Sequence, residues 1–340
     1  MKAALWTKYG SPDGLIISDV PCPAPKENEV LIKTYATTVT AGDCEIRRLD
    51  LPFMLGPLLR IYFGLKRPKN IILGQEFSGK IVEVGHSVKR FSKGMRVFGT
   101  TGFQFGGYAE YMCLPENASD GAIAIMPDNM TFEQAAGVPV GAIEALHFLD
   151  QANIKPSETV LINGSGGSIG SFGIQIAKNL GATVIGVDTR DKFDLMRKAG
   201  ADMVIDYQLE DFTKNGQTYD VILDVIGKSV FSDCINCLKK NGRYLLANPT
   251  LLSMVRGKLL SSTSTKKVIF GSADHTVDRL DYLRKLIEDG KISSFIDKKF
   301  TLDRIVEAHK YIETGRKKGN LIITIHVEAD MHTYIESKEK

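Results

Sequence analysis

The 340-residue sequence lacks the features that mark several specialised protein classes. Its cysteines are odd in number and scattered (Cys22, Cys44, Cys113, Cys234 and Cys237), which argues against a disulfide framework and favours a reducing, cytoplasmic compartment. No apolar run approaches the length needed to cross a bilayer, and the first residues lack the pattern of a secretory signal. A net charge of +3 is too small to predict a nucleic-acid or membrane partner.

What remains is an ordinary globular composition, with 43% hydrophobic and 24% charged residues and enough length for two domains. Residues 1–125 predict short β-strands such as EVLIKTYATTV, GKIVEVG, GMRVFGT and YAEYMCL, which are separated by turn residues. Between them, Leu49–Asn70 is apolar and interrupted by prolines, and it predicts a loop with a short helix. Such a segment either covers a ligand site or simply packs on the core.

From Met126 onwards the pattern changes to strands that alternate with helices. We expect strands at TVLIN, TVIGVD, DMVID, YDVILDVIG, GRYLLA and KKVIFGS, with helices at SIGSFGIQIAKNLG, RDKFDLMRKAG and SVFSDCINCLKK. This alternation predicts an α/β fold with a doubly wound parallel sheet. Two amphipathic stretches, TVDRLDYLRKLIEDG and RIVEAHKYIETG, and the strand NLIITI follow, and a polar tail begins near Val327.

The stretch LINGSGGSIGSFG contains a glycine-rich turn between a predicted strand and a predicted helix. The strict G-x-G-x-x-G pattern fails because Ile169 occupies its third position, whereas a looser spacing fits Gly164, Gly167 and Gly170. The next strand ends at Asp188, where an acid would accept the ribose hydroxyls of a dinucleotide. The turn therefore predicts a phosphate cradle at a helix N-terminus.

The choice between NAD and NADP stays open at this stage. The carboxylate of Asp188 would repel a 2′-phosphate, which favours NAD. Arg190 and Lys192 follow at once, and a guanidinium there would clamp a 2′-phosphate, which favours NADP.

Several motifs in this order resemble those of the medium-chain dehydrogenase/reductase superfamily, in its zinc-free quinone oxidoreductase-like branch. They are TVTAGDCEIR, LGQEFSGKIVEVG, GGYAEY, AAGVPVGAIEALHFL, the glycine turn, GADMVIDY, DVIG, GRYLLANP and RKKGNLIITI. The resemblance implies a GroES-like catalytic domain at residues 1–125 and 273–340, and a Rossmann cofactor-binding domain at residues 126–272. It also implies a homodimer that pairs the edge strand KKVIFGS.

The sequence departs from the superfamily pattern at the positions of the zinc ligands. The three positions that carry catalytic zinc in relatives correspond to Thr40, Gln75 and Val140, and none of these is a good Zn²⁺ ligand. The four-cysteine cluster of the structural zinc site is also missing, and Cys234 and Cys237 form a single C-x-x-C pair that we interpret as core thiols. We therefore expect no zinc.

Without a metal, the implied reaction is the reduction of an acceptor that takes hydride readily, namely a quinone or an α,β-unsaturated carbonyl compound. Thr40 and Gln75 are the candidate hydrogen-bond donors to the developing oxyanion, and Asp43 is expected to order the loop around them. Tyr62, in the apolar segment, either donates a hydrogen bond or packs. The other family readings are an alcohol or aldehyde dehydrogenase and a non-catalytic dinucleotide-binding protein.

The predicted cofactor contacts come from the glycine turn, the ends of the parallel strands and the segments around them. Glu144 stands where many relatives carry threonine, which makes the donor pattern near the nicotinamide different. The full predicted set is Val140, Glu144, Gly164, Ser165, Gly166, Gly167, Ser168, Ile169, Asp188, Thr189, Arg190, Lys192, Tyr207, Val225, Asn248, Phe270, Gly271 and Asn320.

Overall fold

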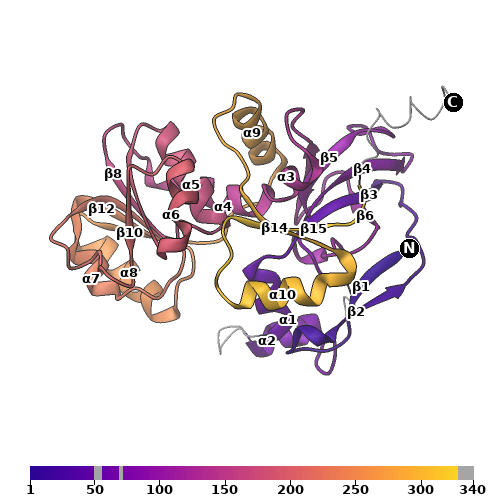
Figure 1. Cartoon of the computed structure of the whole chain (residues 1–340), viewed down its shortest axis with the longest axis horizontal. Coiled ribbons are helices and arrows are strands. Elements are labelled where there is room, and N and C mark those ends of the chain that lie inside the picture. Colours follow the sequence, from indigo (N-terminus) through magenta and orange to yellow (C-terminus); the bar gives the residue numbers. More distant parts are fainter. Residues whose placement is uncertain (50–55, 69–71, 328–340) are drawn as a thin grey trace.

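The computed structural model describes residues 1–49, 56–68 and 72–327 (Figure 1). Parts of the expected covering segment (50–55 and 69–71) and the expected polar tail from residue 328 lie outside the described residues. The helices are α1 (Ala41–Arg48), α2 (Gly56–Phe63), α3 (Phe132–Ala136), α4 (Pro139–Ala152), α5 (Ser168–Asn179), α6 (Phe193–Lys198), α7 (Phe231–Asn236), α8 (Leu251–Thr263), α9 (Val277–Glu288) and α10 (Ile305–Glu313). The strands are β1 (Lys2–Trp6), β2 (Leu15–Asp19), β3 (Glu29–Thr38), β4 (Glu76–Val84), β5 (Arg96–Thr100), β6 (Tyr111–Pro115), β7 (Ala122–Ile125), β8 (Thr159–Asn163), β9 (Thr183–Asp188), β10 (Met203–Asp206), β11 (Tyr219–Asp224), β12 (Leu238–Leu246), β13 (Lys267–Phe270), β14 (Ile296–Thr301) and β15 (Asn320–Thr324).

A six-stranded parallel sheet confirms the predicted α/β unit. Its strands follow the order β10-β9-β8-β11-β12-β13, which is the strand order of the Rossmann fold. The order reverses between β8 and β11, and in such sheets ligands bind at the carboxyl ends of the strands at this reversal. The helix predicted over SVFSDCINCLKK is too long, because α7 ends at Asn236 and Leu238 already pairs with Tyr219 in the sheet.

A second, mostly antiparallel sheet has the order β14-β15-β3-β4-β5-β7, and β6 also pairs with β3. The end of the chain returns to this sheet, because β15 runs antiparallel to β3 and β14 runs parallel to β15. Strands β1 and β2 form a separate hairpin-like pair. This return agrees with a domain built from both ends of the chain, while the boundaries at residues 125 and 273 remain predictions.

Helix α4 lies between the two sheets (Figure 1). It begins with a proline, whose missing N–H costs nothing at a helix start, and ends at Asn153 in the left-handed conformation. Most of its residues are buried, and the core around it joins Ala36 and Phe98 of one sheet to Val160 of the other. In the described ranges, no helix has the length and apolarity that crossing a membrane requires.

Candidate active site

The glycine turn has the geometry of a phosphate cradle. It starts after β8, where Gly164 adopts a φ of 88° that favours glycine, and it ends at Gly167, the N-cap of α5. A methyl group on Gly170 would lie 2.3 Å from the Gly164 carbonyl oxygen, so helix and turn pack in direct contact there. A methyl group on Gly167 would meet nothing closer than that oxygen at 3.6 Å. No side chain caps α5 at Gly167, so the N–H groups of its first turn lack a side-chain acceptor at the N-cap. The phosphates of a dinucleotide would supply one.

Asp188, at the end of β9, is fully engaged by the protein. Its Oδ2 accepts a hydrogen bond from Gly166 N at 2.9 Å, and its Oδ1 accepts one from Thr189 N at 2.8 Å. The Lys192 ammonium lies 3.0 Å from the same Oδ1, and both side chains are buried. A methyl group on Gly166 would lie 2.5 Å from Lys192 Cδ, so this lysine packs directly on the turn. The predicted ribose-binding acid therefore also fixes the glycine turn, with its charge already balanced.

The other predicted residues at this end of the sheet surround Asp188. Arg190 is exposed in the loop after β9, and Tyr207, which is 55% exposed, follows the neighbouring strand β10. Ser165 is buried inside the turn and donates to the Val187 carbonyl at 3.2 Å. Ile169 is half-buried on α5 and packs against the core.

The start of β15 crosses the glycine turn and ties the two sheets together. Gly319 N donates to the Gly166 carbonyl at 2.9 Å, and the Ser168 hydroxyl donates to Asn320 Oδ1 at 2.5 Å. Asn320 Nδ2 donates in turn to Ser294 Oγ at 3.2 Å, and Asn320 is buried. The oxygen and the nitrogen of the Asn320 amide thus both stabilise this junction. Sequence analysis predicted Asn320 only as a cofactor contact. Gly319 and Ser294 were not singled out, because their role depends on contacts across the chain.

Thr40, Asp43 and Gln75 meet at the start of α1. Thr40 caps this helix: its hydroxyl donates to Asp43 Oδ2 at 2.7 Å and accepts from Asp43 N at 3.0 Å. A methyl group on Gly42 would lie 3.6 Å from Thr40 Oγ1 and 3.8 Å from Gln75 Oε1, so both polar groups border the open side of this glycine. Burial raises the pKa of Asp43 to about 6, and the hydrogen bonds from Thr40 oppose the shift.

Glu76 is a buried acid that sequence analysis did not single out. It accepts hydrogen bonds from the Thr38 hydroxyl at 2.5 Å and from Val140 N at 2.7 Å. Burial raises its pKa to about 7, and the nearby charge of Asp43 adds to the shift. Lys317 is half-buried close to Glu76, and its pKa is lowered to about 8, chiefly by burial. We call Asp43, Glu76 and Lys317 the titratable cluster.

The remaining predicted residues each have their own contacts in other parts of the structure. Glu144, on α4, has its Oε1 at 3.6 Å from His275 Nε2, a partner that sequence analysis missed. Asn248 Nδ2 donates to the Val225 carbonyl at 2.7 Å, which joins the loops after β12 and β11. Tyr62 is 58% exposed on α2 and contacts the edge of the Phe63 ring. At the end of β13, Phe270 is half-buried and the Cα of Gly271 faces the His147 side chain.

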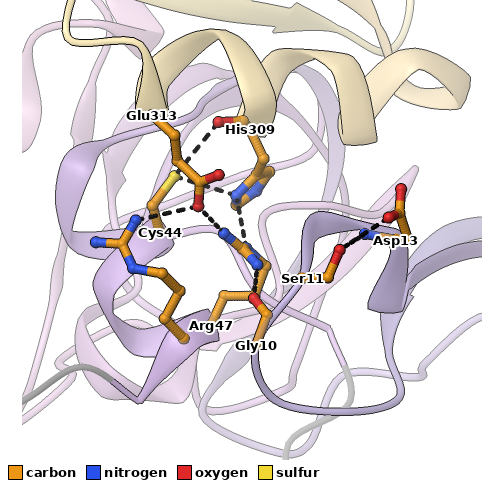
Figure 2. A network of polar contacts seen from close by, with 8 residues as sticks. Gly10, Ser11, Asp13, Cys44, Arg47, His309 and Glu313 are labelled. Carbon is orange, nitrogen blue, oxygen red and sulfur yellow. Dashed lines mark hydrogen bonds and ion pairs between the residues drawn. The ribbon is translucent and has the colours of Figure 1, made fainter.

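A second buried cluster anchors α1 against α10 (Figure 2). The Arg47 side chain is fully buried; its Nε donates to His309 Nδ1 at 3.3 Å, and its two terminal nitrogens contact the Gly10 carbonyl and the Glu313 carboxylate. Cys44 Sγ lies 3.2 Å from the same His309 nitrogen. We call Cys44, Arg47, His309 and Glu313 the anchor cluster. Since Thr40 and Asp43 belong to α1, this cluster sets their position.

Two family models match the chain. Residues 26–125 match the alcohol dehydrogenase GroES-like domain, and residues 199–323 match the zinc-binding dehydrogenase family. The 2-methylene-furan-3-one reductase of Solanum lycopersicum is 30% identical over 335 residues, which cover 95% of this chain and 79% of that protein. The chain belongs to the medium-chain dehydrogenase/reductase superfamily.

Further relatives place this superfamily member in the quinone oxidoreductase-like branch. The chloroplastic NADPH-dependent alkenal/one oxidoreductase of Arabidopsis thaliana is 28% identical over 335 residues, covering 95% of this chain and 79% of that protein. The structure of the quinone oxidoreductase from Coxiella burnetii superposes with a TM-score of 0.84 at 29% identity and covers 96% of this chain and 99% of that one. The predicted combination of a GroES-like domain and a Rossmann sheet is confirmed.

Sequence analysis predicted that the zinc positions of the superfamily correspond to Thr40, Gln75 and Val140 in this chain. The GroES-like match includes Thr40 and Gln75, and the match to the zinc-binding dehydrogenase model begins after Val140, at residue 199. The Thr40 hydroxyl is bonded to Asp43, the Gln75 amide donates to the Gly102 carbonyl at 3.4 Å, and Val140 has no donor atom in its side chain. This donor set does not fit Zn²⁺, which takes thiolates, imidazoles and carboxylates. Within the described ranges, no three His, Cys, Asp or Glu side chains are grouped to hold a metal ion. Zinc-free chemistry stays a prediction.

Proposed function

We propose that the protein is an NAD(P)H-dependent oxidoreductase that reduces quinones or α,β-unsaturated carbonyl compounds. One observation carries this proposal: the glycine turn at Gly167 is joined through β15 to a corner where the neutral side chains of Thr40 and Gln75 lie beside Gly42. Neutral donors suit an acceptor whose carbonyl oxygen gains charge during reduction. The names of the plant and bacterial relatives support the same reaction class.

Different residues of the chain would bind the cofactor and stabilise the charge on the substrate oxygen. The N-terminus of α5 and Gly167 would hold the pyrophosphate, and Arg190 and Tyr207 would hold the adenosine end. When bound, NAD(P)H supplies the hydride ion. Thr40 Oγ1 would donate to the substrate oxygen when a protonated Asp43 donates to Thr40 in place of accepting from it. Gln75 Nε2 would donate with the hydrogen that the Gly102 carbonyl does not take. Asp43 would hold a proton beside Thr40 Oγ1, because its raised pKa of about 6 lies close to neutral pH.

We propose NADPH as the preferred cofactor. The Asp188 carboxylate is balanced by Lys192 at 3.0 Å and bound by two backbone N–H groups, which weakens its repulsion of a 2′-phosphate. Arg190 is exposed in the adjoining loop, where its guanidinium can reach a phosphate. The 2′-phosphate would therefore meet a cation rather than a free carboxylate.

We also propose that the protein acts without zinc, as a homodimer, in the cytoplasm. The donor set at Thr40, Gln75 and Val140 supports the first point. The second is supported by β13, which lies at the edge of the parallel sheet and pairs only with β12 among the described strands. The third is supported by five free cysteines, a state typical of a reducing compartment. The net charge of +3 gives no support to a nucleic-acid partner.

A turnover screen tests the reaction and the cofactor preference together. We expect the purified protein to oxidise NADPH with quinones or enones, and chelator treatment to leave the rate unchanged. Arg190→Ala should raise the KM for NADPH about tenfold and leave the KM for NADH unchanged, because a charge-assisted bond to phosphate is lost. Lys198→Ala, an exposed cation on α6, is the matched control.

Two outcomes would contradict the proposal. Oxidation of alcohols that stops when zinc is removed would make the protein an alcohol dehydrogenase. Firm NADPH binding with no turnover of any quinone or enone would make it a non-catalytic dinucleotide-binding protein. Equal effects of Arg190→Ala on both cofactors would remove the phosphate-binding role of Arg190 alone.

A further inference from the structure

Helix α8 exposes an unusual stripe of large apolar side chains. Leu251, Leu252, Val255 and Leu259 are 61%, 58%, 61% and 65% exposed. Since an α-helix turns by about 100° per residue, these four side chains lie within an arc about 100° wide around the helix axis. We call them the α8 stripe. A contiguous row of this kind differs from the single exposed apolar residues that occur on any surface.

The opposite side of α8 packs on the sheet. Gly257 is the one buried residue of this helix, and it lies nearly opposite the centre of the stripe. A methyl group on Gly257 would lie 2.8 Å from Val268 Cγ1 and 3.4 Å from Phe270 Cε1, so the helix backbone rests closely on β13. The α8 stripe therefore points away from the protein. Figure 1 shows α8 at the outer end of the parallel-sheet half of the molecule.

Basic residues border the stripe on both sides. Arg256 follows one edge of its arc and Lys258 precedes the other, and both side chains are exposed. Acidic residues are missing from the whole chain segment between Asp233 and Asp274. The cations of that segment are Lys239, Lys240, Arg243, Arg256, Lys258, Lys266 and Lys267. Two of them are balanced from outside the segment, because Lys239 pairs with Asp220 and Arg243 pairs with Glu158.

We propose that α8 docks the protein on the surface of an anionic lipid bilayer. The stripe would enter the boundary between headgroups and acyl chains, while Arg256 and Lys258 would pair with lipid phosphates and carboxylates. With 13 residues and a length of about 20 Å, α8 can lie in this interface but cannot cross it. The small net charge of the whole chain conceals this site, because the positive charge is local.

A second copy of the chain suits this stripe less well. Two α8 helices packed face to face would bring Arg256 and Lys258 of both copies together, and the segment offers no carboxylate to balance them. The lipid surface supplies both the apolar phase and the negative charge that this helix lacks. The proposal concerns this surface alone and does not depend on the reaction above.

Vesicle sedimentation with the full chain tests the proposal. We expect binding to phosphatidylcholine vesicles that contain about a third phosphatidylserine, weaker binding at high salt, and little binding to phosphatidylcholine alone. Val255→Glu/Leu259→Glu should lower the partition coefficient at least about tenfold, because two apolar anchors become anions. Arg256→Ala and Lys258→Ala should each lower it about fivefold, the equivalent of about 1 kcal/mol per cation.

The control is Ile16→Glu, which places the same charge at an apolar residue of β2 that is 51% exposed. It should bind vesicles like the unaltered protein. Circular dichroism and turnover of a water-soluble quinone should be the same for every variant, since none of these residues belongs to the candidate site. Absence of vesicle binding, or equal binding by Val255→Glu/Leu259→Glu, would overturn the proposal. A dimer that this double variant dissociates in sedimentation equilibrium, without vesicle binding, would assign the stripe to a second copy.

Discussion

Helix α1 contributes residues to two buried polar clusters: burial moves pKa values away from neutral pH in one cluster and towards neutral pH in the other. In the anchor cluster, burial lowers the pKa of His309 to about 3 and raises the pKa of Cys44 to about 12. In the titratable cluster, burial brings the pKa values of Asp43, Glu76 and Lys317 to about 6, 7 and 8. One cluster keeps a single protonation state across the physiological range, whereas the other changes its state within it.

The difference follows from which partners each buried group has. His309 faces the permanent charge of Arg47, which adds to the effect of burial in keeping the imidazole neutral. Glu76 faces another acid, Asp43, together with neutral donors and the half-buried Lys317. Groups that titrate near neutral pH concentrate at functional sites, whereas fixed pairs serve structure. The comparison therefore separates the part of α1 that holds the fold from the part that faces the chemistry.

The largest effect should come from breaking the anchor cluster. Arg47→Met should lower the free energy of unfolding by about 3 kcal/mol, because it removes the donor to the buried His309 Nδ1 and to the Gly10 carbonyl and leaves Arg48 as the remaining arginine on Glu313. Urea unfolding can be followed by the fluorescence of Trp6, which is buried in the same core as α10. Arg48→Ala is the control, since this arginine also bonds Glu313 but is partly exposed and should cost less than about 1 kcal/mol.

His309 should make the fold sensitive to acid. Below pH 6.5 the unfolded chain binds a proton at this histidine, whereas the folded chain does not do so until about pH 3. Acidification from pH 7 to pH 5 should therefore lower the contribution of His309 to stability by about 2 kcal/mol. His309→Gln keeps an acceptor for Arg47 Nε and should remove this part of the pH dependence in urea unfolding. An unchanged slope in the variant would contradict the neutral, buried histidine.

Local sequence signals were sufficient to predict the half of the molecule that contains the parallel sheet. The parallel sheet and the glycine turn were predictable because a strand, a tight turn and an amphipathic helix follow one another within the segment around Gly164–Gly170. Clashes that require glycine at Gly170 also arise inside this segment. Thr40 and Asp43 were predictable as neighbours for the same reason, since they form one capping box.

Contacts between distant residues explain what sequence analysis missed. Arg47 and His309 are 262 positions apart, and the shifted pKa of Glu76 depends on burial that only the tertiary fold creates. Helix α8 was not predicted because its apolar residues face solvent instead of the core. Strand β14 was not predicted because half or fully exposed lysines occupy its centre, so it shows no apolar alternation.

The smallest effect is expected from Glu76, with a sign opposite to that of His309. Its folded pKa of about 7 exceeds the ordinary value of 4.5, so the folded chain binds a proton between pH 7 and pH 5 while the unfolded chain does not. Acidification should therefore stabilise the fold through Glu76, by at most about 2 kcal/mol.

Glu76→Gln should abolish this gain and remove an inflection near pH 7 from the rate of NADPH oxidation. The Gln oxygen can still accept from Val140 N, and the Thr38 hydroxyl can rotate to accept from the new amide NH2. Glu83→Gln, on the exposed face of the same strand β4, should alter neither measurement. Parallel slopes for Glu76→Gln and His309→Gln would show that the two clusters titrate alike, because opposite slopes require one acid that gains a proton on folding and one base that loses it.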